Sequence, residues 1–198
     1  MNYWKEFLPV YFYTFVAITL GVAASLTSAY SITVTGLLIL AGLISWFFVE
    51  YALHRSFFHY HARSEFMKNL IYRMHLSHHD NPKGLDTLLA SVYTSLPIAT
   101  IYCLIIWMLT SWQIMSYMFA GLIIGYFAYE ALHYQAHHYT PKSSILRYLK
   151  KYHMLHHHQT PEMRYGVTTP FIDYLFGTYL PVGQKISVAT SENLRKTS

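Results

Sequence analysis

Two stretches of the chain repeat one histidine pattern, "HLSHH" and "HMLHH". The two triplets are His75, His78 and His79, and His153, His156 and His157. Residues at positions i, i+3 and i+4 of an α-helix share one face, so each stretch should bring three imidazoles together. Neutral imidazole suits iron, zinc, copper and nickel rather than magnesium or calcium. Each triplet is therefore a candidate part of a transition-metal site.

A histidine pair precedes each triplet. His133 and His137 in "HYQAH" have the helical spacing i, i+4, so their side chains should converge. His54 and His59 in "HRSFFH" are one residue further apart, about 140° round a helix, and can converge only if the helix ends or bends between them. We expect that bend near residues 56–58.

Together the pairs and triplets supply ten candidate ligands. One ion cannot use ten imidazoles, whereas two ions with about five each can. A cluster that senses pH is the alternative, but its charged rings would repel one another. Among the other histidines, His61 and His158 fit surface positions, and His138 competes with His137 as the partner of His133. Helical geometry favours His137.

Four acids are candidates for orienting the ligands, because a ligating imidazole usually donates its second N–H to a carboxylate or carbonyl. They are Glu50, Asp80, Glu130 and Asp173. Glu50 and Glu130 lie within about a turn of a histidine, although both could instead mark the ends of membrane spans.

Two long apolar blocks must position these residues. Residues 7–49 and 87–129 contain no charged residue and no histidine. As one helix, each block would reach about 64 Å, twice the thickness of the hydrocarbon core, so each should form two spans. We place the turns near residues 27–31 and 110–116, and the spans at about 7–27, 32–50, 87–109 and 114–132. The predicted fold is an all-α, integral membrane bundle of four transmembrane helices in two hairpins.

The charges indicate the orientation of these spans. All 14 Lys and Arg residues lie outside the two blocks, on the same side as both termini and the histidines. The positive-inside rule makes this side cytoplasmic. The net charge of +5 follows from this orientation, so no nucleic-acid partner is implied. The first apolar segment ends in small residues, as secretory signals do, but we expect it to remain as an anchor. A single cysteine, Cys103, excludes disulfides and cysteine-based metal sites.

The polar segments repeat with the spans. The triplets recur at an offset of 78 residues, which indicates a duplicated unit of one hairpin and one cap. Within the caps, Ser64 with Glu65, and Pro141 with Ser143 or Ser144, fit the starts of two amphipathic helices. We expect one membrane-embedded domain over residues 1–182, with helical cytoplasmic caps at 51–86 and 133–182 that hold the di-metal site, and a polar tail at 183–198.

In order along the chain, "HRSFFH", "HLSHH", "HYQAH", "HMLHH" and "YGVTTPFIDYLFGTYLP" resemble the fatty acid hydroxylase superfamily of integral-membrane di-metal enzymes. The similarity covers about residues 50–181 and is greatest to fatty acid 2-hydroxylases, whose ten metal-binding histidines fall on the ten positions above. The resemblance implies two iron ions, with zinc as a possible substitute, and O₂ as co-substrate. It also implies a lipid in the bilayer, foremost a fatty acyl chain, as the substrate.

Those enzymes often carry a fused cytochrome b5 domain, for which this chain has no room. We therefore expect a separate electron carrier, resembling either cytochrome b5 or ferredoxin. Carotenoid hydroxylases and sterol desaturases of the same superfamily are the alternative activities. A metal-binding membrane protein without catalysis is an alternative of another class. A metal transporter is disfavoured, because neither apolar block contains an ionisable group at mid-membrane.

Overall fold

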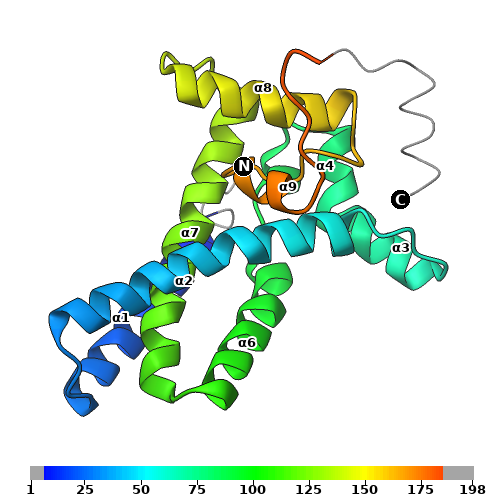
Figure 1. Cartoon of the computed structure of the whole chain (residues 1–198). Helices are drawn as coiled ribbons and strands as arrows, with labels where there is room; N and C mark the ends of the chain where they lie inside the picture. Colours follow the sequence, from blue (N-terminus) through cyan, green and yellow to red (C-terminus); the bar gives the residue numbers. More distant parts are fainter. Residues whose placement is uncertain (1–6, 185–198) are drawn as a thin grey trace. The chain divides into compact units, whose positions relative to one another are not determined.

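A computed structural model describes residues 7–184, and over that range the protein is all helical, without a β-strand (Figure 1). This confirms the predicted fold class. Its longest helices are α1 (Leu8–Thr27), α2 (Ile32–Leu53), α6 (Val92–Leu109) and α7 (Trp112–His138). The pairing of spans into hairpins, the cytoplasmic caps and the division at residue 182 stay predictions, and most of the predicted tail lies outside the described residues.

Four helical stretches are long and apolar enough to cross a membrane: Leu8–Thr27, Ile32–Phe58, Leu85–Leu109 and Trp112–His138. Many large apolar side chains on them face outward, and Leu26, Ile32 and Met108 are each more than 80% exposed. Lipid tails cover such a surface at no cost, whereas water does not. By length and composition, the chain is a multi-pass membrane protein.

The helix ends differ from the predicted spans where a serine caps the helix. Helix α7 begins at Trp112, because Ser111 Oγ accepts a hydrogen bond from the Ile114 N–H at 3.3 Å. Helix α6 begins at Val92 rather than near residue 87, because Ser91 Oγ accepts from the Thr94 N–H at 3.3 Å. Both are N-caps that satisfy donors which the helix itself leaves free.

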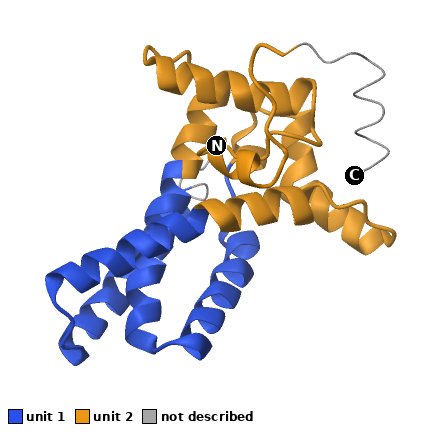
Figure 2. Ribbon diagram, viewed as in Figure 1, with its two compact units in different colours: residues 1–46, 89–128 blue, residues 47–88, 129–198 orange. Residues whose placement is uncertain are grey.

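The chain divides into two compact units (Figure 2). Unit 1 comprises residues 1–46 and 89–128, and unit 2 comprises residues 47–88 and 129–198. Helices α2 and α7 contribute to both, since each crosses a boundary between units. All ten candidate ligands belong to unit 2.

Within unit 1, two glycines let α2 and α7 approach closely. A Cβ atom at Gly42 would collide with the backbone of Met118, and one at Gly121 with the backbone of Ile39. Small residues allow such contact between membrane helices, where close packing must replace the hydrophobic effect. Gly42 and Gly121 therefore allow the backbones of α2 and α7 to pack directly against each other.

Unit 2 contains the C-terminal ends of α2 and α7 and the shorter helices. Besides α8 (Ser144–His158), they are the π-helices η2 (His54–Phe58) and η3 (Tyr72–Leu76), and the α-helices α3 (Glu65–Ile71), α4 (Ser77–Asp80), α5 (Leu85–Leu88) and α9 (Phe171–Leu175).

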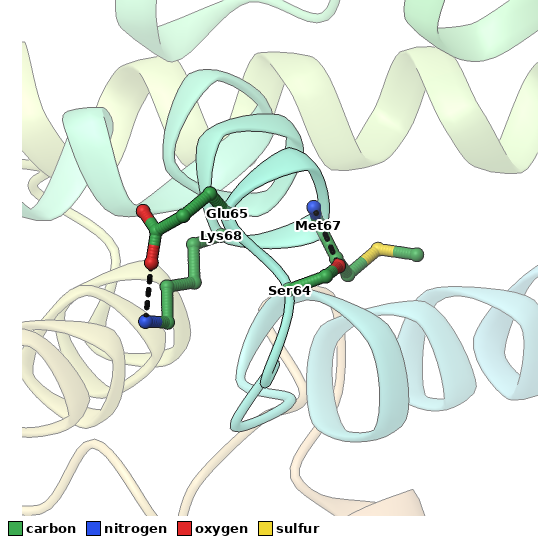
Figure 3. Close-up of polar contacts among 4 residues, drawn as sticks. All are labelled: Ser64, Glu65, Met67 and Lys68. Carbon is green, nitrogen blue, oxygen red and sulfur yellow. Dashed lines mark hydrogen bonds and ion pairs between the residues drawn. The ribbon is translucent and has the colours of Figure 1, made fainter.

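The predicted N-cap of the first cap helix is confirmed. Figure 3 shows Ser64 Oγ accepting a hydrogen bond from the Met67 N–H at 3.3 Å, and Lys68 paired with Glu65 at 2.7 Å. Helix α8 also begins where expected, with Ser143 at its N-cap position.

Candidate metal centre

The structure brings the ten predicted histidines together in two groups of five. The first group is His54, His59, His75, His79 and His156. The second group is His78, His133, His137, His153 and His157. In each group, one ring nitrogen from every member lies within 4.8 Å of the others. The remaining histidines lie outside both groups: His61 and His158 are exposed, and the His138 ring stacks on Tyr134 with 4.4 Å between centroids.

The nitrogen spacing inside the groups matches that of donors around one ion. Nε2 of His79 lies 2.9 Å from Nε2 of His75, and Nε2 of His137 lies 2.9 Å from that of His153 and 3.2 Å from that of His78. Adjacent donors at about 2.1 Å from an octahedral ion are about 3.0 Å apart, and tetrahedral donors slightly more. The rings therefore have the separation that metal coordination requires.

Each group contains four histidines from one half of the chain and one histidine from the other half. The first group takes four histidines from the first half, and its fifth is His156 on α8. The second group takes four from the second half, and its fifth is His78 on α4. Each triplet is thus divided: its i, i+4 pair serves one group and its middle member serves the other. Neighbouring residues on a helix point about 100° apart, so His78 and His79 can belong to different groups.

The expected bend between His54 and His59 takes the form of the π-helix η2. Its wider turn, closed by a hydrogen bond from the His59 N–H to the His54 carbonyl at 3.3 Å, brings residues five apart onto one side of the chain. A second π-helix, η3, contains His75, where we expected regular α-helix. Single π-turns of this kind often occur at functional sites.

The imidazoles outside the spans are kept neutral. Burial, and secondarily the neighbouring histidines, lowers the pKa of His59 and of His78 to about 3. Burial lowers the pKa of His79 to about 4, although the charge of Asp80 acts in the opposite direction. The pKa values of His75, His153, His156 and His157 are lowered for the same reasons. Neutral rings carry the lone pair that a metal needs.

Two rings of the first group are oriented by backbone carbonyls. His54 Nδ1 lies 2.6 Å from the Tyr165 oxygen, and His156 Nδ1 lies 2.7 Å from the Met163 oxygen. A carbonyl only accepts, so each Nδ1 carries the proton and each Nε2 keeps its lone pair. Both Nε2 atoms are buried without a hydrogen-bond partner in the described part of the chain. Such unpartnered acceptors fit a bound cation.

Two of the candidate acids contact this carbonyl segment. Glu50 Oε1 accepts hydrogen bonds from the N–H groups of Val167 at 2.6 Å and Thr168 at 3.0 Å. Asp173 accepts from the N–H groups of Tyr165 and Gly166, each at 2.8 Å. Both acids are buried. The two acids therefore contact the loop, and the loop carbonyls in turn contact the histidines.

The other two candidate acids are Asp80 and Glu130. Asp80 is exposed at the end of α4, next in sequence to His79, and Glu130 is buried one turn before His133 on α7.

Sequence reasoning missed Arg164, a residue of the same loop whose side chain ties it to the segment after α9 (Phe171–Leu175). Its side chain is fully buried and donates to the carbonyls of Leu180 at 3.1 Å and Pro181 at 3.3 Å, and to the Thr160 hydroxyl. Its φ of 62° lies in the left-handed region, which costs a non-glycine residue on the order of 1 kcal/mol. No glycine or asparagine stands here to signal the turn.

Comparison with known proteins gives consistent results. The family model described as fatty acid hydroxylase matches residues 39–178. The chain is 32% identical over 144 residues to the dihydroceramide fatty acyl 2-hydroxylase FAH2 of Arabidopsis thaliana, and 33% identical over 180 residues to the fatty acid 2-hydroxylase of Mus musculus. These alignments cover 72% and 86% of this chain, but 60% and 48% of the relatives.

One solved structure has a closely similar fold. It is described as full-length scs7p with only the hydroxylase domain visible, and superimposes with a TM-score of 0.81 at 27% identity. The match covers 92% of this chain and 69% of that one.

Proposed function

This chain belongs to the fatty acid hydroxylase family, and on that premise we propose that it is an O₂-dependent hydroxylase of a fatty acyl chain in the membrane. The observation that carries the proposal is the pair of five-histidine groups, whose nitrogens have the spacing of metal ligands. Relatives that act on fatty acids and on the acyl chain of dihydroceramide, at position 2, favour the same position here.

The proposed ligands are all ten histidines, five for each of two iron ions. Imidazole suits iron, and the groups contain no carboxylate that would favour a harder cation. When bound, iron supplies the redox chemistry needed to use O₂. Zinc would fit the same rings but has no redox chemistry, so a zinc-loaded chain should be inactive.

In the proposed reaction, one oxygen atom of O₂ replaces a C–H bond with C–OH, and the other leaves as water. The balance requires two electrons and two protons from outside. We propose a separate carrier for the electrons, of the cytochrome b5 or ferredoxin type. The positive-inside argument puts both termini and the histidine groups on the cytoplasmic side, where such a carrier would meet them.

The protein's own contribution is to hold neutral, oriented rings in a place from which water is largely excluded. The carbonyls of Met163 and Tyr165 fix the protonated nitrogens of His156 and His54. Burial keeps the rings uncharged and strengthens each of these polar contacts.

Activity on a defined lipid tests the proposal. The purified chain is loaded with iron without oxygen, placed in bilayer discs that contain fatty acids or ceramides, and given reductant and isotopically labelled O₂. The proposal predicts one labelled oxygen atom on the acyl chain, detected by mass spectrometry. Product on sterols or carotenoids alone would reject the acyl substrate. A metal-loaded chain that oxidises none of these lipids would instead indicate a metal-binding protein without catalysis.

A further inference from the structure

The two histidine groups differ in the hydrogen-bond partners of their Nδ1 atoms. In the first group, the Nδ1 atoms of His54 and His156 each face a backbone carbonyl. In the second group, Nδ1 is buried without a hydrogen-bond partner among the described residues in four of five members: His78, His133, His153 and His157. Carbonyl orientation is thus concentrated in one group.

Both carbonyls come from one short loop, and that loop has little regular structure of its own. Residues 159–170 lie between α8 and α9, and Met163 and Tyr165 flank the strained Arg164. Because a loop without ladder or helix hydrogen bonds needs other partners for its N–H groups, something else must set the direction of these carbonyls.

Two buried carboxylates supply those partners. Asp173 takes the N–H of Tyr165 on Oδ1 and the N–H of Gly166 on Oδ2, and its Oδ1 also accepts from the Thr178 hydroxyl at 2.7 Å. Glu50 takes the N–H groups of Val167 and Thr168, and its second oxygen accepts from the Thr168 hydroxyl. Four consecutive N–H groups, from residue 165 to residue 168, therefore point at carboxylates.

We propose that Glu50 and Asp173 are positioning residues for one of the two ions only, the ion of the first group. By holding residues 165–168 they aim the Tyr165 carbonyl at His54. Asp173 also holds Thr178, whose carbonyl accepts the Arg164 N–H at 3.0 Å, and this N–H belongs to the peptide whose Met163 carbonyl faces His156. The two sites then differ in how tightly they keep their metal. The inference rests on the proposed metal centre, and does not depend on which reaction that centre performs.

Metal retention distinguishes the two sites. The full chain in detergent is loaded with cobalt(II), dialysed against a chelator and analysed for ions per chain. The unchanged chain should keep two. Asp173→Asn, which replaces an acceptor with a donor facing an N–H, should keep one, and Glu50→Gln should weaken the same site by about 10–100-fold, as expected for partners of metal ligands.

Double variants identify the site that is lost. His59→Ala removes a ligand of the first group, and His133→Ala one of the second. Asp173→Asn combined with His59→Ala should still keep one ion, whereas Asp173→Asn with His133→Ala should keep none. The cobalt absorption spectrum of Asp173→Asn should match that of His59→Ala, because the same ion remains in both.

A matched control separates positioning from loss of stability. Leu88→Ala opens a cavity at a buried position of unit 2 that has no part in the loop, and should lower the unfolding temperature while both ions stay. If Asp173→Asn keeps both ions, or releases both in parallel, the inference is wrong. If the unchanged chain itself keeps no ion, the metal centre fails together with the inference.

Discussion

Nε2 of His78 lies 3.2 Å from Nε2 of His137, although the two residues are 59 positions apart and come from different halves of the chain. His79, the next residue, places its own Nε2 2.9 Å from that of His75, in the other group. One short helix therefore supplies ligands to both groups, and the two proposed ions depend on both halves of the chain.

His78 lies in the first half of the chain but belongs to the second group, so replacing it should affect the ion of the second group. His78→Ala removes a donor from the second group, so we expect that ion to be lost and hydroxylation to fall by at least ~100-fold, the upper range even for residues that only support metal ligands. His61→Ala changes an exposed histidine outside both groups and should leave metal content and activity unchanged. Elemental analysis and a turnover assay measure both. Equal effects from the two variants would contradict the ligand assignment.

The metal-free protein should be sensitive to acid. The pKa of His59 and of His78 is lowered to about 3 in the fold, while an unfolded chain has a histidine pKa of about 6.5. Unfolding therefore takes up protons below pH ~6.5, so stability is greatest above that pH and is lost as the pH falls toward about 3. Each such histidine contributes about 1.4 kcal/mol per pH unit in that window.

Thermal unfolding of chelator-treated protein between about pH 5 and pH 8 measures this dependence. His78→Ala should make the curve less steep, because it removes one of the groups that take up protons. An unfolding temperature that stays constant over this range would show that the rings are not held neutral by burial.

Metal removal at neutral pH should lower stability as well. Ligands that bind only the folded state stabilise it by mass action, by about 2.7 kcal/mol when their concentration is 100 times the dissociation constant. We expect added zinc or iron to raise the unfolding temperature of the apo chain, and magnesium to have no effect, because imidazole is a poor ligand for magnesium. Equal stabilisation by magnesium would indicate nonspecific binding of cations.

The glycine contact between α2 and α7 should be intolerant of any side chain. Gly42→Ala puts a methyl group against the Met118 backbone, and overpacking of this kind costs about 1–3 kcal/mol. Gly36→Ala on the same helix is the matched control, since a Cβ there has no neighbour within 4 Å, and alanine is the better helix former. Unfolding in detergent should show a lower stability than the unchanged chain for Gly42→Ala but not for Gly36→Ala. Comparable curves for the two variants would argue against close packing.

The sequence predicted which ten histidines gather better than it predicted their division into two groups. The spacing of His75, His78 and His79 showed that three rings share a helix, but did not show that His78 serves the other group. That assignment depends on how α4, α7 and α8 pack, which is a tertiary effect. A break between His54 and His59 could be inferred from their spacing, whereas η3 could not, because "YRMHL" contains neither glycine nor proline.

The hydrophobic pattern located the four long helices, since uncharged stretches of this length have few other stable structures. Their ends were less predictable: α7 runs on to His138 without a break, and Ser91 and Ser111 cap helices at positions that hydropathy does not mark. The role of residues 163–168 was beyond sequence reasoning, because backbone carbonyls and N–H groups leave no trace in residue type. Arg164 at positive φ is the extreme case.

The most direct test of this account is the number of transition-metal ions that the purified full-length chain retains after dialysis, measured by elemental analysis against protein concentration. Two ions per chain, with one lost in His59→Ala and one in His133→Ala, is the predicted result. A chain that retains no ion, or one whose ions survive both substitutions, would contradict the claim that ten histidines form two metal sites.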